Sequence, residues 1–257
     1  MSAQRVWITG ASSGIGRALA LEMARRGAAV VATARRAEAL AELSGAASGL
    51  KGSIRAEPAD VTDADALELL VARVEAEDGP IDTAILNAGL YLPVRAEEFD
   101  LAKFETSFAV NLGGTVKALA PILPRMMARK RGRIAFVASV AGYGGLPTSS
   151  AYGATKAALI NMAESLKFDC DRHGVTVQVI CPGFVETPAT EVNPFPMPFI
   201  IPAEEAARRI ADGLETNRFE IAFPRRFAFI LKAINLLPYR LYFPLVARAT
   251  GWNKPVM

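Results

Sequence analysis

Short apolar segments alternate with helical segments along most of the chain, and this alternation constrains the fold more than any other feature. Continuous apolar strands separated by helices are typical of a parallel sheet that is covered by helices on both faces. The sequence therefore predicts an α/β fold, a three-layer doubly wound parallel sheet of about seven strands. The expected strands are residues 6–9, 28–34, 53–57, 81–86, 133–138, 176–181 and 220–223.

The alternation continues without an internal repeat or a linker, which favours one domain over residues 1–257. We expect its core to span residues 5–223 and to be followed by an apolar and basic, helical C-terminal extension, residues 224–257. A long helical pattern covers residues 101–130, where Pro121 and Pro124 predict an interruption. Asn111 lies in the middle of this pattern, although asparagine is a poor helix-interior residue because its side chain competes for backbone hydrogen bonds.

Charge and cysteine content exclude several classes of protein. The net charge of +3 is too small to argue for a nucleic acid partner, so we expect none. Cys170 and Cys181 are the only cysteines and form no disulfide framework. The chain enters its first strand directly, without a signal peptide, so we expect a cytoplasmic protein. A single histidine, His173, excludes histidine-based triads and histidine-rich metal sites, and we expect no metal.

A glycine-rich turn, residues 10–16, joins the first expected strand to the first helix. This architecture is typical of a dinucleotide phosphate site, because glycines allow close approach and the helix N-terminus offers free N–H groups. The spacing Gly-x-x-x-Gly-x-Gly differs from the more common Gly-x-Gly-x-x-Gly, and a purely structural turn is the alternative. Arg35 and Arg36 follow the second strand, with no acid before Glu38, and predict NADP(H) because arginine accommodates a 2′-phosphate. A solvated pair at a helix start is the alternative.

Ser139, Tyr152 and Lys156 form the candidate catalytic group. Ser139 lies where the fifth strand ends, and Tyr152 and Lys156 are one turn apart on the following helix. A tyrosine hydroxyl titrates near pH 10, and a neighbouring ammonium favours the phenolate. The pair could therefore act as an acid and base toward a substrate oxygen that Ser139 holds. A tyrosine and a lysine on a solvated helix face are the alternative.

These motifs occur together in one order, and with them the chain resembles the short-chain dehydrogenases/reductases, in their short, single-domain, NADP-preferring branch. The resemblance covers roughly residues 5–223. It implies a Rossmann-like fold and an enzyme that interconverts a carbonyl and a secondary alcohol. The motifs are Thr9-Gly10-x-x-x-Gly14-x-Gly16, Asn87-Ala88-Gly89, Asn111, Ser139, Tyr152-x-x-x-Lys156 and Pro182-Gly183.

The resemblance also implies a role for each matching residue. Tyr152 exchanges the proton with the substrate, and Lys156 lowers the pKa of Tyr152 and binds the nicotinamide ribose. Ser139 holds the substrate oxygen, and Asn111 anchors a water that links Lys156 to solvent. A homodimer or homotetramer, built through the helices that carry Asn111 and Tyr152, is expected. The expected cofactor contacts are Gly10, Ser12, Ser13, Gly14, Ile15, Gly16, Arg35, Arg36, Asp60, Val61, Asn87, Ala88, Gly89, Tyr152, Lys156, Pro182, Gly183, Val185 and Thr187.

Two segments bear on the substrate. Residues 188–202 are rich in proline and carry Phe195, Met197, Phe199, Ile200 and Ile201, which predict an apolar lid and an apolar or lipid-like substrate. Packing of these side chains on the core is the alternative. Residues 221–257 contain no acidic residue and mix basic with aromatic and aliphatic ones. Such a segment suits a membrane surface, through residues 226–250, but also a subunit interface or a pair of helices covering the pocket.

The sequence thus favours an NADP(H)-dependent oxidoreductase acting on a small, apolar carbonyl or alcohol. A non-catalytic NADP-binding regulator and a membrane-peripheral scaffold on the same fold are the alternatives. The complete set of Asn111, Ser139, Tyr152 and Lys156 argues against both, since a binding module does not need all four.

Overall fold

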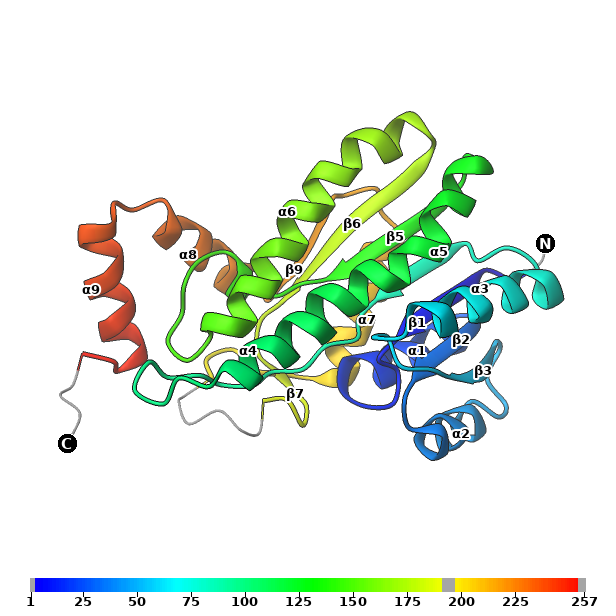
Figure 1. The fold of residues 1–257 in the computed structure, drawn as a ribbon, viewed down its shortest axis with the longest axis horizontal. Helices are drawn as coiled ribbons and strands as arrows, with labels where there is room; N and C mark the ends of the chain where they lie inside the picture. Colours follow the sequence, from blue (N-terminus) through cyan, green and yellow to red (C-terminus); the bar gives the residue numbers. More distant parts are fainter. Residues whose placement is uncertain (1–2, 191–196, 254–257) are drawn as a thin grey trace.

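A seven-stranded parallel sheet forms the centre of the molecule in the computed structural model, which describes residues 3–190 and 197–253 (Figure 1). The strand order is β3-β2-β1-β4-β5-β6-β9, which confirms the predicted doubly wound sheet. A separate pair, β7 (Val185–Glu186) and β8 (Ile201–Pro202), was not predicted. The strands of the main sheet are β1 (Arg5–Thr9), β2 (Ala29–Ala34), β3 (Ser53–Pro58), β4 (Thr83–Leu86), β5 (Gly132–Val137), β6 (Val175–Pro182) and β9 (Glu220–Phe223).

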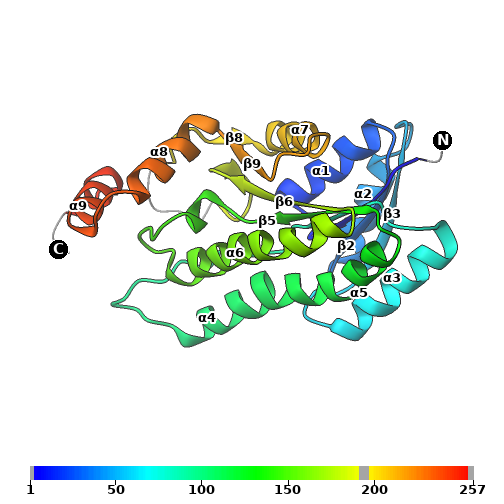
Figure 2. The same cartoon turned by 90° about the horizontal axis from the view of Figure 1, so that it is seen from above.

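Helices cover both faces of the sheet, which Figure 2 shows edge-on. Each face has its own apolar cluster, because the side chains of a strand alternate between the two sides. In β1, Ile8 belongs to one cluster and Trp7 to the other, and both are fully buried. One face carries α1 (Gly14–Arg25), α2 (Ala37–Ala46) and α7 (Ala203–Leu214); the other carries α3 (Ala64–Asp78), α4 (Leu101–Ser107), α5 (Gly114–Ala128) and α6 (Ser150–Arg172).

The strand order reverses at the centre of the sheet. β1 pairs with β2 on one side and with β4 on the other, all in parallel. The segments that leave the carboxyl ends of β1 and β4 therefore turn toward opposite faces. A crevice opens at this edge of such a sheet, where ligands bind in folds of this kind.

The long helix between β4 and β5 corrects one sequence prediction. It is interrupted by a π-helical turn, Phe108–Gly113, and not near Pro121 or Pro124, which both lie inside α5. The buried face of α5 packs against the sheet, and this packing offsets the backbone hydrogen bonds that the two prolines remove. The π-turn is centred on Asn111, and such turns occur frequently at functional sites.

The C-terminal extension forms two helices, α8 (Arg225–Asn235) and α9 (Tyr239–Thr250), as predicted in outline. They follow β9 and lie at the end of the molecule farthest from the N-terminus (Figure 1). No helix within the described ranges is both long enough and apolar enough to cross a bilayer.

Gln178 on β6 fixes the loop that leads into β9. Its side chain is fully buried, and Nε2 donates to the carbonyl oxygens of Gly213, Thr216 and Arg218 at 3.2, 3.0 and 2.8 Å. Its Oε1 accepts from Arg133 at 2.6 Å. A buried glutamine here is favourable because every polar atom has a partner.

We expect Gln178→Leu to lower the free energy of unfolding by about 3 kcal/mol, because it leaves buried carbonyl groups without a donor. Urea denaturation measures this change. The control is Asn217→Ala, which loses only an exposed contact of 3.5 Å to Arg133 and should change stability by less than about 0.5 kcal/mol. Equal effects of the two substitutions would contradict the role of Gln178.

Candidate active site

A cavity of about 1020 Å³ lies at the carboxyl ends of the strands. Its walls come from segments that follow the strands and from α6, α8 and α9. Every residue that the sequence predicted to be catalytic or to bind the cofactor lines this cavity, except Asn111. The residues brought together are Gly10, Ser12, Ser13, Gly14, Ile15, Gly16, Arg35, Arg36, Asp60, Val61, Asn87, Ala88, Gly89, Ser139, Tyr152, Lys156, Pro182, Gly183, Val185 and Thr187.

The glycine-rich turn requires glycine at two positions. Gly10 has a φ of +69°, and a Cβ there would lie 2.7 Å from Ala88 Cα. A Cβ on Gly16 would lie 2.3 Å from the carbonyl oxygen of Gly10. Both distances are too short for any side chain, so the turn is packed against itself and against the segment that follows β4.

Asn87 holds this turn in place. Its Nδ2 donates to the carbonyl oxygens of Thr9 and Gly10, at 2.9 and 3.2 Å. The Thr9 hydroxyl in return accepts from the backbone N–H groups of Asn87 and Ala88 at 3.0 and 3.1 Å. The Asn87 amide therefore lines the cavity while it connects the carboxyl ends of β1 and β4.

The N-terminus of α1 is open to an anion. Ser13, the residue before the helix, makes no side-chain hydrogen bond to the first turn, and this turn contains no acidic residue. The positive end of the helix dipole therefore faces the cavity without compensation. Arg36 lies nearby, where Nη2 donates to Ser12 Oγ and to the Ser12 carbonyl oxygen at 3.2 and 3.3 Å. This chemistry fits the phosphates of a dinucleotide.

Asp60 lies across the cavity from the helix end and is held as a carboxylate. Its Oδ1 accepts from the backbone N–H of Thr62 at 2.8 Å and from the Thr62 hydroxyl at 2.9 Å. The backbone hydrogen bond from Thr62 is the main cause that lowers the pKa of Asp60, and the charge of Arg35 adds to it. Asp60 and Arg35 are thus close enough to interact at the end of the site where the sequence places the adenosine.

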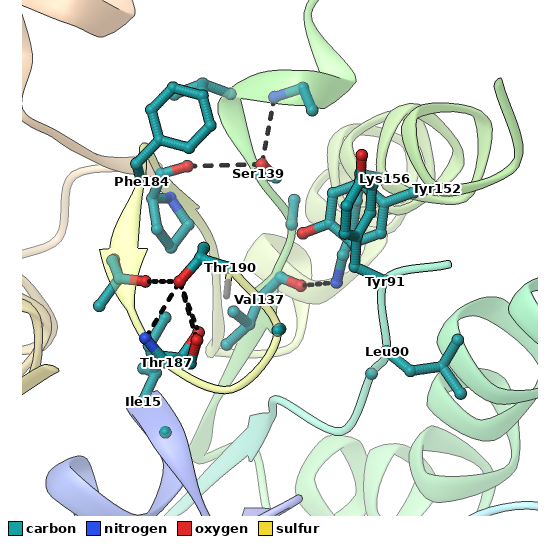
Figure 3. A pocket seen from close by; sticks show the side chains of 18 of the residues that line it. Ile15, Leu90, Tyr91, Val137, Ser139, Tyr152, Lys156, Phe184, Thr187 and Thr190 are labelled. Atoms are coloured by element: carbon teal, nitrogen blue, oxygen red, sulfur yellow. Dashed lines mark hydrogen bonds between the residues drawn. The ribbon is translucent and has the colours of Figure 1, made fainter. Parts of the chain in front are cut away.

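Ser139 follows β5 by two residues and lines the cavity (Figure 3). Its Oγ accepts from the Ala141 N–H at 3.1 Å, as a cap of the short 3-10 turn Val140–Gly142, and donates to the Pro182 carbonyl at 3.4 Å. Tyr152 and Lys156 project from successive turns of α6. The geometry brings the predicted serine, tyrosine and lysine to one wall of the cavity.

Burial sets the protonation of Tyr152 and Lys156. It raises the pKa of Tyr152 to about 12, opposed by a hydrogen bond with Ser139. It lowers the pKa of Lys156 to about 8. Lys156 Nζ donates to the Val137 carbonyl oxygen at 2.7 Å and lies 5.5 Å from the centroid of the Tyr152 ring. In this structure the desolvation of the phenol therefore outweighs the influence of the ammonium, and the lowering of the tyrosine pKa by Lys156 stays a prediction.

Asn111 lies behind the cavity wall and is fully buried. Its Oδ1 accepts from the Leu90 N–H at 2.8 Å, and Nδ2 donates to the Leu90 carbonyl and to Thr155 Oγ1 at 3.0 and 3.2 Å. Gly89 lies between Asn111 and Lys156, because a Cβ on Gly89 would be 3.3 Å from Asn111 Oδ1 and 3.5 Å from Lys156 Nζ. The π-turn thus places a polar side chain directly behind the lysine.

Tyr91 and Thr190 are among the residues of the cavity wall that sequence reasoning did not identify. Tyr91 packs edge-on against Tyr152, with ring centroids 5.1 Å apart, and its hydroxyl contacts Thr148 at 2.9 Å. Thr190 Oγ1 accepts from the Thr187 N–H at 3.1 Å and donates to the Val185 carbonyl at 2.7 Å. Neither contact leaves a periodic signal in the sequence. The position of Tyr91, two residues after the Asn87-Ala88-Gly89 motif, was the only available indication.

The described part of the predicted lid lines the cavity, but not through the apolar side chains that the sequence singled out. Phe195 lies outside the described residues. Ile201 packs against the core as part of β8, and Phe199 is 53% exposed, with its ring 5.9 Å from that of Phe227. Of the described residues of the lid, Pro188, Ala189, Thr190 and Pro198 line the cavity, whereas Met197, Phe199, Ile200 and Ile201 do not. Much of the apolar wall comes instead from the C-terminal extension.

The extension forms one side of the cavity, which was one of the three interpretations left open by the sequence. Its contact with the body of the protein includes a hydrogen bond from Tyr242 Oη to the Gly145 carbonyl oxygen at 2.7 Å. Lys232 also pairs with Glu220, which accepts from Tyr143 at 2.7 Å. Both contacts reach the segment between Ser139 and α6. The cavity residues of the extension are Phe227, Ile230, Leu231, Ile234, Val246, Ala249, Thr250, Gly251 and Trp252.

Comparisons with known proteins identify relatives of this chain and structures with the same fold. The family model described as short chain dehydrogenase matches residues 4–194. An uncharacterized oxidoreductase of Myxococcus xanthus is 36% identical over 94% of this chain and 96% of its own length. The 3-oxoacyl-[acyl-carrier-protein] reductase of Thermotoga maritima is 36% identical over 73% of this chain and 76% of its own.

A solved structure of a short-chain dehydrogenase from Streptomyces avermitilis superposes with a TM-score of 0.81 at 26% identity. It covers 99% of this chain, which in turn covers all of that one. The family model, the relatives and the solved structure agree on one family. The chain therefore belongs to the short-chain dehydrogenase family, whose members are oxidoreductases that use a nicotinamide cofactor.

Proposed function

We propose that this protein is an NADP(H)-dependent oxidoreductase that interconverts a carbonyl and a secondary alcohol on an apolar substrate. The observation that carries the proposal is the convergence of Ser139, Tyr152 and Lys156 on the wall of a cavity that also holds the glycine-rich turn. The bound nicotinamide supplies or accepts the hydride. The protein itself, which we propose to act as one domain, must bind both reactants, orient them and move one proton.

Tyr152 is the group that moves the proton. Its pKa of about 12 keeps the phenol protonated at neutral pH, as a proton donor to a carbonyl must be. The Ser139 hydroxyl holds the substrate oxygen beside it. Lys156 stays cationic below its pKa of about 8 and favours the phenolate that remains after the proton has left. Asn111, behind Lys156, anchors a water through which the proton is replaced.

Preference for NADP(H) over NAD(H) rests on Arg35 and Arg36. Both line the cavity immediately after β2, where a 2′-phosphate or a 2′-hydroxyl of the adenosine ribose is recognised. Asp60, which follows β3, offsets part of the charge of Arg35, but it is one carboxylate against two arginines and does not replace an acid at the end of β2. The local charge is therefore positive, which favours the phosphate.

An apolar substrate is supported by the wall that faces Tyr152. Phe227, Leu231 and Ile234 of α8 and Val246 of α9 line the cavity. One relative is named as a reductase of 3-oxoacyl groups, which combine a ketone with an acyl chain. A substrate of this class would place its oxygen at Tyr152 and its chain against α8 and α9.

We further propose that the protein works in the cytoplasm, at a membrane surface, and as a homodimer or homotetramer. Large apolar side chains are exposed along the layer that carries α4, α5 and α6, where the family resemblance places the subunit contact. They are Leu101, Phe108, Val116 and Phe168, which are 61%, 40%, 45% and 77% exposed.

Tyr152→Phe tests the proposed reaction. We expect it to lower the rate of NADPH-dependent reduction of medium-chain ketones by about 10²–10⁴-fold, because it removes the proton donor and keeps the ring. Tyr91→Phe is the matched control, since it removes a hydroxyl from the same cavity and should keep the rate within a few-fold. If NADPH binds but no ketone in a series of rising chain length is reduced, a non-catalytic NADP-binding regulator or scaffold becomes the better interpretation.

Arg35→Ser tests the cofactor preference. We expect kcat/KM for NADPH to fall by about 10–100-fold, because one charge-assisted contact to the 2′-phosphate is lost. The value for NADH should stay unchanged, which makes it the internal control. A wild-type protein that prefers NADH would contradict the assignment of Arg35 and Arg36.

The pH dependence of reduction tests the role of Lys156. We expect kcat/KM at saturating NADPH to fall as the pH rises through about 8, because Lys156 loses its proton there while Tyr152 keeps its own up to about 12. The steady-state rate from pH 6 to 10 measures this limb. A rate that is constant over the whole range would show that the charge of Lys156 is not required.

A further inference from the structure

The two helices of the C-terminal extension have opposite faces with different surroundings. One face lines the cavity, through Phe227, Leu231 and Val246. The other face exposes large apolar side chains to solvent, an arrangement that few soluble proteins keep without a partner. These exposed side chains are Phe229, Leu236, Tyr239, Leu241, Phe243 and Leu245, which are 74%, 86%, 76%, 52%, 62% and 42% exposed.

The exposed residues form a continuous surface and not isolated positions. Arg226, Phe229 and Leu236 follow one another at spacings of three and seven residues, which puts them on one face of α8 and its end. Leu236 and Tyr239 are three residues apart across the junction between the two helices, and the ring of Tyr239 stacks on that of Phe243, one turn further along α9, with centroids 5.6 Å apart. The helices lie at one extremity of the molecule (Figures 1 and 2), so this surface is accessible to a large, flat partner.

Positive charge accompanies this apolar surface. Arg225, Arg226, Arg240 and Arg248 are exposed, and within the described residues none of their guanidinium groups forms an ion pair. Lys232 alone is paired, with Glu220. No acidic residue occurs from position 221 to the end of the sequence. The surface therefore carries unopposed positive charge between its aromatic and aliphatic side chains.

We propose that the outer surface of α8 and α9 docks on an anionic lipid bilayer. Amphipathic helices with basic residues beside aromatic and aliphatic ones bind in this way, with the apolar face buried among the lipid headgroups. A second copy of the chain fits less well, because a two-fold contact would bring the same patch, with its four arginines, against itself. An anionic lipid surface instead supplies the missing negative charge.

Docking would place the mouth of the cavity at the bilayer. Ile230 and Trp252 both line the cavity and are 45% and 42% exposed, so they stand where the cavity meets the outer surface. An apolar substrate dissolved in the membrane could then enter along α8 without crossing water. This delivery of substrate rests on the proposed function, whereas the docking itself does not.

Sedimentation with lipid vesicles tests the docking. The full-length protein is expected to pellet with vesicles that contain phosphatidylglycerol, and to do so less at high salt, because salt screens the arginines. The triple variant Arg226→Gln, Arg240→Gln, Arg248→Gln should bind roughly 100-fold more weakly. The control variant Lys51→Gln, Arg172→Gln, Arg218→Gln removes as many exposed charges from the segments that precede β3, β6 and β9, at the amino ends of the strands. It should bind as the wild type does.

A second variant tests the apolar contribution. Phe229→Ser, Leu236→Ser, Phe243→Ser changes only exposed side chains and should abolish sedimentation while NADPH binding persists. The proposal is wrong if the wild-type protein stays in the supernatant, or if the control variant loses binding as the arginine variant does. The surface instead joins two copies of the chain if the wild-type protein does not sediment with vesicles and light scattering shows a wild-type oligomer that the serine substitutions dissociate. That outcome also contradicts the proposal. Sedimentation without ketone reduction would keep the docking and reject the proposed function.

Discussion

The hydrogen bonds between Thr9 and Asn87 fix the geometry on which the rest of the site depends. They join the carboxyl ends of β1 and β4, where the sheet reverses its order and the crevice opens. The glycine-rich turn is held between these ends, and Gly10 and Gly16 are packed too closely for any side chain. The open N-terminus of α1 is therefore presented to the cavity by a rigid support. Phosphate recognition follows from that support, because it is made by backbone groups.

Desolvation governs the chemistry of the same cavity. Tyr152 and Lys156 lie in a desolvated environment, and their pKa values move apart, to about 12 and about 8, because desolvation disfavours the phenolate and the ammonium alike. The ammonium of Lys156 donates a hydrogen bond to the Val137 carbonyl oxygen, and the π-turn places Asn111 behind Lys156. The Asn111 amide is thus kept close to the buried ammonium of Lys156 without occupying the cavity. Asn111 and Lys156 can then support proton transfer to Tyr152 while the substrate occupies the cavity.

The C-terminal extension links the substrate side of the cavity to the outer surface. Its inner side chains form an apolar wall opposite Tyr152, and Tyr242 and Lys232 attach it to the segment between Ser139 and α6. Its outer side chains remain exposed and basic. The same two helices therefore influence which substrate fits and from where it arrives. Because the extension is attached close to Ser139, a movement of its helices would also shift the part of the cavity wall that carries Ser139.

The sequence by itself determined the parallel sheet, the glycine-rich turn and the set of side chains that meet in the cavity. Strand patterns and the contacts of a helix N-terminus are local, so they can be read from neighbouring residues. Only the tertiary structure decided that the helix bearing Asn111 bends into a π-turn and continues through Pro121 and Pro124, because packing on the sheet offsets the lost hydrogen bonds. It also assigned much of the apolar wall to α8 and α9 and not to Met197, Phe199, Ile200 and Ile201. Contacts between segments so distant in the chain depend on how the elements pack, which no local pattern records.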